Sequence, residues 1–121
     1  MKLNQYIDHT VLKATATTSD VSQLCAEAKA HEFFSVCINS AWVPTARKLL
    51  AGSPVKVCSV IGFPLGAMST AAKVFEAGQA VADGADRVIG PLRRDAVSAV
   101  FAQSPLPAER VTLVMAAVRE A

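Results

Sequence analysis

The chain has 121 residues, of which 52% are hydrophobic and 18% charged, with a formal net charge of +2. These values predict one globular domain over residues 1–121, exclude a disordered chain, and argue against nucleic acid or a membrane surface as a partner. No apolar run approaches about 18 residues and the N-terminus lacks a secretory leader, so the sequence predicts a cytoplasmic protein.

The chain opens with a short helix or turn, and an apolar segment over residues 6–12 follows. Three polar residues in a row interrupt this segment: Asp8, His9 and Thr10. Burying such side chains inside a strand is costly unless each finds a partner. We therefore expect either a strand end exposed to water or a strand end that lines a polar site, and the sequence leaves both open.

A helix is expected next over residues 20–31, with Thr18 or Ser19 as its cap. A strand over residues 33–39 and a helix over residues 40–50 come after it, and Pro44 fits the first turn of that second helix. The apolar residues of the first helix recur on one face at Val21, Leu24, Cys25 and Ala28.

The central stretch reads as a strand, a loop, a helix and a second strand. Residues 55–61 are mostly apolar and β-branched, which suits a buried parallel strand, and the loop over residues 62–66 ends it. Ser69 or Thr70 can cap a helix that continues to about residue 82. Gly84 then fits the left-handed position after that helix, before a strand that opens near Asp86.

This alternation of strands and helices predicts parallel βαβ units. An open doubly wound sheet and a (β/α)8 barrel both begin in this way. A dinucleotide-binding Gly-x-Gly-x-x-Gly motif is missing, which weakens the Rossmann interpretation. A flavodoxin-like module stays open, although it needs acidic residues at strand ends and only Asp8 and Asp86 are candidates.

Three cysteines, Cys25, Cys37 and Cys58, are spread widely along the chain. Their spacing fits neither a zinc motif nor a disulfide framework, so we expect reduced thiols and no metal.

Several segments resemble the deoxyribose-phosphate aldolase family, over about residues 7–86. They are IDHTVLK at residues 7–13, SVCIN at residues 35–39, WVP at residues 42–44 and KVCSVIGFPLG at residues 56–66, with further agreement at Ser69, Thr70, Lys73, Glu76, Ala77 and residues 84–86.

The resemblance implies a (β/α)8 barrel that reversibly cleaves 2-deoxy-D-ribose 5-phosphate to acetaldehyde and D-glyceraldehyde 3-phosphate. The family uses a lysine Schiff base, needs no metal or other cofactor, and serves deoxyribonucleotide catabolism. By resemblance, Asp8 is a proton-relay carboxylate beside the family's lysine pair, while Thr10 and Cys37 line the pocket for a phosphorylated sugar or aldehyde. Barrel enzymes place such groups at the C-terminal ends of strands.

Residues 87–121 depart from the family pattern. The strand that carries a further aspartate in the family is shortened after Asp86, and no lysine follows Lys73, so no Schiff-base lysine is identified. We expect Lys13 and Lys73 to be surface lysines. Five of the six arginines lie beyond Asp86 and every lysine lies before it, so we hypothesise a replaced, frame-shifted or rearranged tail.

The tail can still fold, with a helix over residues 93–103 and, over residues 108–120, a helix or a strand leading into a helix. Its first helix would point Ala96, Val97, Val100 and Phe101 inward.

Together these features predict a truncated chain that forms the N-terminal half of a barrel, with about four strands, and that is inactive alone. Its open edges favour a homo-oligomer or aggregation. The alternative is a non-catalytic oligomerising or phosphate-sugar-binding remnant that holds an anion with the loop over residues 62–66 and a helix N-terminus.

Overall fold

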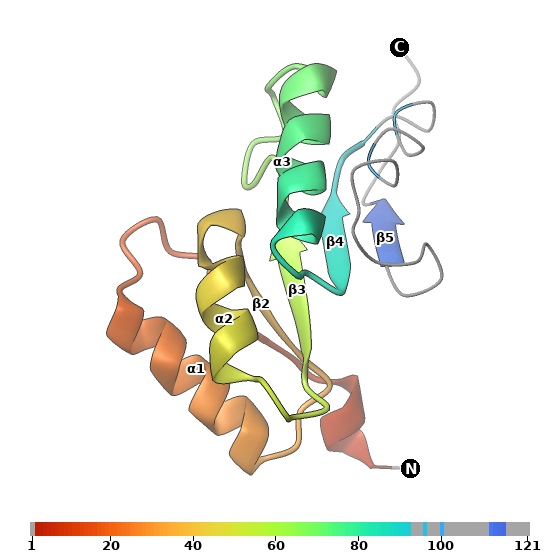
Figure 1. The fold of residues 1–121 in the computed structure, drawn as a ribbon. Helices are drawn as coiled ribbons and strands as arrows, with labels where there is room; N and C mark the ends of the chain where they lie inside the picture. The colour runs from red at the N-terminus through yellow and green to blue at the C-terminus, as the bar shows by residue number, and fades with distance from the viewer. Residues whose placement is uncertain (1, 93–95, 97–99, 101–111, 116–121) are drawn as a thin grey trace.

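The computed structural model describes residues 2–92, Ala96, Val100 and the backbone of residues 112–115 (Figure 1). Five parallel strands form one sheet: β1 (Asp8–Thr10), β2 (Ser35–Asn39), β3 (Lys56–Val60), β4 (Arg87–Gly90) and β5 (Thr112–Met115). The helices between them are α1 (Thr18–Ala30), α2 (Val43–Leu49) and α3 (Thr70–Ala82), and two 3-10 helices, η1 (Leu3–Tyr6) and η2 (Ser40–Trp42), lie before β1 and α2.

The strands follow one another across the sheet in chain order, from β1 to β5. A (β/α)8 barrel adds each strand beside the previous one, whereas a flavodoxin-type sheet reverses direction at a switch point. The flavodoxin-like alternative is therefore wrong, and the predicted parallel βαβ units are confirmed. Four strands precede the tail, as expected for about half of a barrel, and the tail adds β5, which pairs with β4 from Arg87–Thr112 to Gly90–Met115.

The main core lies between the sheet and its helices. Strand residues alternate sides because successive side chains point to opposite faces, so Val36, Ile38 and Val57 face the helices. The apolar face predicted for α1 is the one that is buried. This helix-covered side is called the outer face below. It contains Val21, Leu24, Ala28, Val36, Ile38, Val43, Val57, Ile61, Ala77, Val81 and Val88, all 5% exposed or less.

The cap of α1 differs from the prediction, because it is Thr17 rather than Thr18 or Ser19. The Thr17 hydroxyl accepts from the Asp20 amide at 3.2 Å, and the Asp20 carboxylate accepts from the Thr17 amide at 2.8 Å. This reciprocal capping box requires the acidic residue three positions after the cap, which selects Thr17. For α3 the cap is Ser69, one of the two predicted candidates.

The segment after α3 is fixed by Asp86. Its Oδ2 accepts from the Val57 amide at 3.0 Å and from Arg47 Nη1 at 3.1 Å. Gly84 has φ +111°, and an added Cβ would lie 3.1 Å from Arg47 Cγ. The positive φ favours glycine there, and a larger residue would also press on the Arg47 side chain. These contacts tie the start of β4 to β3 and α2.

The tail helix predicted over residues 93–103 lies outside the described residues, except that Ala96 and Val100 are buried as expected. Of the two alternatives for residues 108–120, a helix or a strand leading into a helix, β5 agrees with the second, and the helix after it lies outside the described residues. No helix in the described part of the chain is both long enough and apolar enough to span a membrane.

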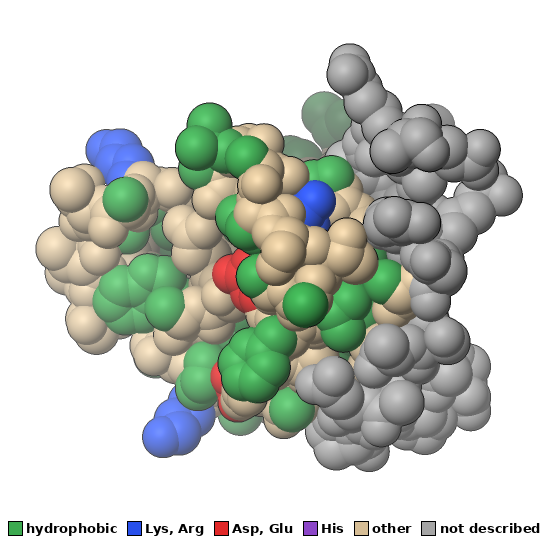
Figure 2. All heavy atoms as spheres, turned by 90° about the horizontal axis from the view of Figure 1, so that it is seen from above, with side chains coloured by type: hydrophobic (Ala, Val, Ile, Leu, Met, Phe, Trp, Pro, Cys, Tyr) green, Lys and Arg blue, Asp and Glu red, His purple; other side chains and the backbone are tan. Residues whose placement is uncertain are grey.

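Large apolar side chains are exposed near the C-terminal ends of the strands, on the loop after β3 and on α3. Figure 2, which looks down on this end, shows exposed apolar side chains in several separate patches. The residues are Phe63, Leu65, Met68 and Phe75, and we call them the apolar rim. A cavity of about 520 Å³ adjoins it, lined by Ser40, Ala41, Met68, Ala72, Phe75, Glu76, Gln79 and Asp83.

Candidate functional site

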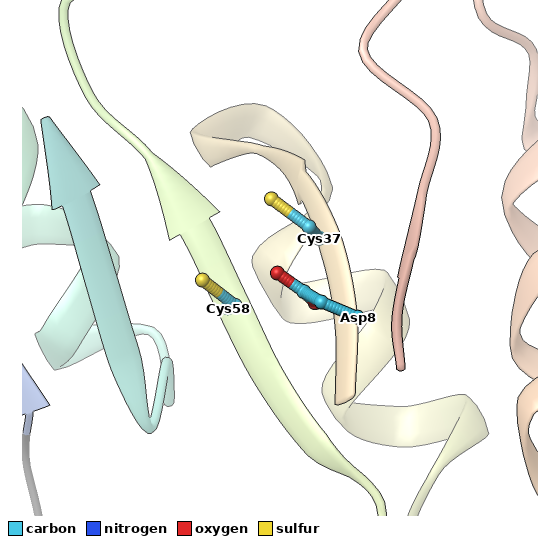
Figure 3. A group of neighbouring side chains, drawn as sticks. All are labelled: Asp8, Cys37 and Cys58. Carbon is cyan, nitrogen blue, oxygen red and sulfur yellow. The ribbon is translucent and has the colours of Figure 1, made fainter. Parts of the chain in front are cut away.

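The side of the sheet that faces away from the helices, called the inner face below, carries polar and sulfur-containing side chains. Asp8 of β1, Cys37 of β2 and Cys58 of β3 come from three neighbouring strands and point toward one another (Figure 3). One ligand-type atom from each of the three lies within 4.8 Å of the others. Strand register brings the two thiols together, because Cys37 is the direct partner of Cys58.

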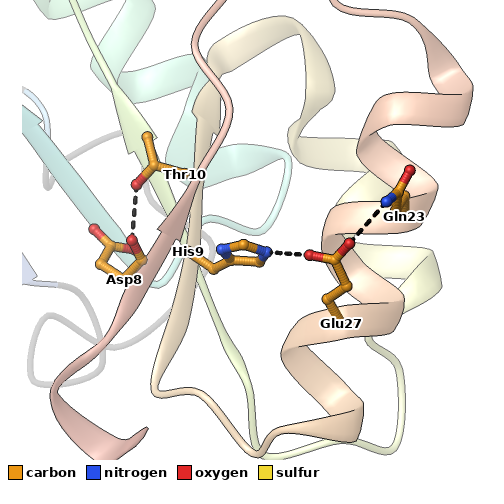
Figure 4. Close-up of polar contacts among 5 residues, drawn as sticks. All are labelled: Asp8, His9, Thr10, Gln23 and Glu27. Carbon is orange, nitrogen blue, oxygen red and sulfur yellow. Dashed lines mark hydrogen bonds and ion pairs between the residues drawn. The ribbon is translucent and has the colours of Figure 1, made fainter.

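β1 sends its three polar residues to opposite sides of the sheet (Figure 4). His9 points to the outer face, where its Nε2 lies 2.7 Å from Glu27 Oε2, and Gln23 donates to the other oxygen of Glu27 at 2.9 Å. Asp8 and Thr10 lie on the inner face, and the Thr10 hydroxyl donates to the Asp8 carbonyl at 2.8 Å. The three polar residues thus have two roles: Asp8 and Thr10 belong to the candidate site, and His9 makes a structural contact with α1.

The Asp8 carboxylate is held by a hydrogen bond across the β1–β2 pair. Ser35, its partner in the strand register, donates from Oγ to Asp8 Oδ1 at 2.6 Å. Ser35 is fully buried and Asp8 is half-buried. A short bond to an ionised acceptor is among the stronger hydrogen bonds in proteins, so this carboxylate has a fixed orientation.

The two inner cysteines have pKa values shifted in opposite directions. A hydrogen bond from Cys58 lowers the pKa of Cys37, against the opposing influences of burial and Asp8. The same bond raises the pKa of Cys58, and burial raises it further. Cys37 is therefore the thiol of the pair that ionises first, with Cys58 as the donor.

The loop after β3 is fixed by Glu76 of α3. Its Oε1 accepts from the Gly62 amide at 2.7 Å, while its Oε2 accepts from Ser40 Oγ at 2.6 Å. The Gly66 amide donates to the Gly62 carbonyl at 2.6 Å. Both glycine amides are therefore paired within the protein.

The predicted site residues Asp8, Thr10 and Cys37 share the inner face. Only Thr10 occupies the last position of its strand; Asp8 begins β1 and Cys37 lies at the centre of β2. The lysines that the sequence left as candidates lie elsewhere: Lys13 is exposed, and Lys73 is half-buried on α3.

Sequence reasoning missed Ser35, Cys58 and Glu76 as parts of this region. The sequence spacing predicted reduced thiols but did not indicate that Cys37 and Cys58 are neighbours, and the structure places them opposite each other on β2 and β3. The similar short segments SVC and KVC each place a cysteine at the third position, which could have indicated that the two thiols are neighbours in a parallel sheet. Ser35 and Glu76 gave no comparable signal, since their partners depend on strand register and helix packing.

Comparison with known proteins finds deoxyribose-phosphate aldolases among the related sequences and among the solved structures. No family model matches the chain. A deoxyribose-phosphate aldolase from Bdellovibrio bacteriovorus is 56% identical over 88 residues, which are 73% of this chain and 40% of that protein.

Solved structures named for the same enzyme also superpose on this chain. A protein from Coccidioides immitis, provisionally named a deoxyribose-phosphate aldolase, superposes with a TM-score of 0.79 at 35% identity, over 92% of this chain and 47% of that one. The deoxyribose phosphate aldolase of Aeropyrum pernix, described as having a unique tetrameric structure, gives a TM-score of 0.70 at 32% identity, over 84% of this chain and 44% of that one. The chain thus spans less than half the length of these proteins.

Proposed function

Because this chain belongs, over the segment that matches, to the deoxyribose-phosphate aldolase family, we propose that its inner face is one wall of a Schiff-base aldolase site. The substrate would be 2-deoxy-D-ribose 5-phosphate, cleaved reversibly to acetaldehyde and D-glyceraldehyde 3-phosphate. The observation that carries the proposal is the shared inner-face position of Asp8, Thr10 and Cys37.

Aldol cleavage needs an electron sink at the carbonyl carbon and a group that moves protons. In this family a neutral lysine amine forms the iminium that provides the sink. Asp8 would serve the proton transfers, since Ser35 holds its carboxylate in one orientation at 2.6 Å. The Thr10 hydroxyl and the Cys37 thiol would line the pocket for the small aldehyde.

We further propose that these 121 residues do not complete the reaction alone. No lysine follows Lys73, Lys13 is exposed, and Lys73 belongs to a helix whose buried residues face the outer core. A nucleophilic lysine is usually desolvated so that its amine is neutral at physiological pH. The exposed side chain of Lys13 is not desolvated in this way.

Borohydride trapping tests the missing nucleophile. The purified chain is incubated with 2-deoxy-D-ribose 5-phosphate and sodium borohydride, and its intact mass is measured beside the full-length Bdellovibrio relative. We expect an adduct on the relative and an unchanged mass for this chain. A stoichiometric adduct on this chain, mapped to Lys13 or Lys73, would show that the nucleophile is present.

A chimera tests the proposed wall directly. Residues 1–86 of this chain are joined to the part of the Bdellovibrio protein that follows its matching segment, and cleavage is assayed. We expect activity in the chimera, a loss of at least about 100-fold on Asp8→Asn, and little change on His9→Gln, its neighbour on the outer face. Equal activity of Asp8→Asn and the unsubstituted chimera would contradict the role of Asp8.

We also propose that the chain forms a homo-oligomer in the cytoplasm. The apolar rim supports self-association, since Leu65 is 84% exposed and Phe75 68% exposed, and large exposed apolar groups tend to mark contact surfaces. The three free cysteines suit a reducing compartment. Light scattering should give a mass above that of one chain, and Leu65→Ser with Phe75→Ser should lower it; a monodisperse monomer would contradict the proposal.

A further inference from the structure

The cluster of Asp8, Cys37 and Cys58 has a second chemical capacity that an aldolase pocket does not need. We propose that these three side chains bind one thiophilic divalent cation of the zinc class on the inner face. Zinc takes sulfur ligands from cysteine and oxygen ligands from carboxylates, usually four in a tetrahedral arrangement. The proposal concerns metal binding alone and does not depend on the aldolase function.

The spacing of the three ligand atoms supports a metal site. Ligand atoms about 2.3 Å from a tetrahedral zinc ion lie roughly 3.8 Å apart. The Asp8 oxygen and the two sulfur atoms already lie within 4.8 Å of one another. Closing the set around an ion therefore requires small side-chain movements, with the three backbones held by the β1–β2 and β2–β3 pairings.

Neighbouring groups hold the three ligand side chains in place. Metal ligands are commonly oriented by hydrogen bonds from neighbouring groups, and losing such a neighbour weakens binding by about 10- to 100-fold. Ser35 supplies that contact for Asp8 through its 2.6 Å hydrogen bond to Oδ1. Cys37 and Cys58 are 4% and 0% exposed, so their positions are set by packing within the inner face.

The charges of the ligands and of their surroundings also suit a divalent cation. Two thiolates and one carboxylate carry three negative charges, and a divalent cation neutralises two of them. Arg87, the strand partner of Cys58, supplies a further positive charge beside both cysteines. Buried charges are tolerated when they are compensated in this way. The occupied site would thus be close to neutral overall.

The ligand types select the kind of metal. Thiolates favour zinc and other soft ions, while magnesium and calcium require oxygen ligands. Three protein ligands leave a fourth position for water or another small molecule, as in zinc sites with an open position. We therefore expect one equivalent of zinc or cobalt to bind and magnesium not to compete.

The test uses the full chain under anaerobic conditions, with a phosphine reductant that keeps all three thiols free. Cobalt(II) is titrated in and followed by the near-ultraviolet thiolate-to-cobalt band, and zinc is then added to displace it. We expect one cobalt per chain, removal of the band by zinc, and an unchanged band in excess magnesium. Absence of a thiolate band, or an intensity that keeps rising beyond one equivalent, would overturn the proposal.

Variants assign the ligands. Cys37→Ser and Cys58→Ser should each weaken cobalt binding at least tenfold, and Asp8→Asn should weaken it while leaving a thiolate band. Cys25→Ser is the matched control, because Cys25 is a buried free thiol of α1 in the outer core. Binding that survives Cys37→Ser or is lost with Cys25→Ser would refute the assignment.

Folding of each variant is checked by far-ultraviolet circular dichroism, because Cys58 is fully buried. If Cys58→Ser unfolds, Cys37→Ser and Asp8→Asn decide the result. The readout is a metal-binding spectrum, so failure of the aldolase proposal leaves it unaffected.

Discussion

The two faces of the sheet have the same backbone but different chemistry. The outer face buries valine, isoleucine and alanine against three helices, whereas the inner face combines a carboxylate and hydroxyls with a small apolar cluster of the two thiols, Val60, Leu12 and Ile89. β1 shows the contrast within three residues, since His9 serves the outer side and Asp8 and Thr10 the inner side. Side-chain alternation thus lets one set of strands carry stability on one side and reactivity on the other.

A matched pair of substitutions tests this contrast with the largest expected effect. Ile38 is fully buried on the outer face, while Ile89 is half-buried beside the inner thiols. Ile38→Ala should lower the free energy of unfolding by about 2–5 kcal/mol because it leaves a cavity in the core. Ile89→Ala should cost about 1 kcal/mol. Urea denaturation gives both values, and equal losses would contradict the division between the faces.

Asp86 is a polar exception in the outer layer. Asp86→Ala should lower the free energy of unfolding by about 2–3 kcal/mol, since it leaves the Val57 amide and the Arg47 guanidinium without their acceptor. Asp83→Ala is the control, because the bond that its carboxylate makes with Gln79 is exposed. This substitution should change stability by less than about 0.5 kcal/mol. Similar unfolding midpoints for the two variants would show that the Asp86 contacts are not stabilising.

Acid should weaken the polar contacts of α1. A bond with His9, followed by one from Gln23, lowers the pKa of Glu27 below its ordinary 4.5, and bonds with Thr17 lower the pKa of Asp20 below 3.8. The stability gained is therefore complete above those ordinary values and is lost as the pH falls through the lower folded-state values. Both groups are exposed, so the effect is modest. Denaturation midpoints measured down to about pH 3 should show it.

Glu27→Gln removes one of these two titrations and should flatten the acid side of the profile. Its midpoint at neutral pH should also fall slightly, because the contact with His9 is weaker. An acid slope identical to that of the unsubstituted chain would contradict the contribution of Glu27.

Thiol alkylation probes the faces without a large effect on stability. The pKa of Cys37 lies below the ordinary 9.0 because Cys58 donates to it, while burial raises the pKa of Cys25 in the outer core. Iodoacetamide should therefore modify Cys37 before Cys25, and at a lower pH, because the thiolate is the nucleophile. Peptide mass spectrometry follows each site over time.

Cys58→Ala removes the donor and should move the labelling of Cys37 to higher pH. Faster modification of Cys25 than of Cys37 in the unsubstituted chain would contradict the assignment of the inner thiol as the more acidic one.

The outer layer was largely predictable from sequence. The spacing of Val21, Leu24, Cys25 and Ala28 indicates the buried face of α1, and alternating strands and helices indicate a parallel sheet. Errors arose where local sequence offered several equivalent choices. Thr17, Thr18 and Ser19 are all good caps, and the choice among them depends on Asp20, which pairs with a cap three positions earlier.

The site was predictable only in part. Asp8, Thr10 and Cys37 came from the resemblance, and the structure places all three on the inner face. The remaining neighbours depend on how strands align, because Cys58 and Ser35 reach the site through register and lie 21 residues after Cys37 and 27 after Asp8. A sequence reports periodicity within an element well, but register between elements poorly.

Glu76 has a consequence for motion. A single carboxylate holds both the turn after β3, through the Gly62 amide, and the start of η2, through Ser40. We therefore expect the two segments at this edge of the sheet to open and close as one cooperative unit, and their amide protons to exchange with solvent together. Glu76→Ala would uncouple them, turning one slow opening event into two independent and faster ones.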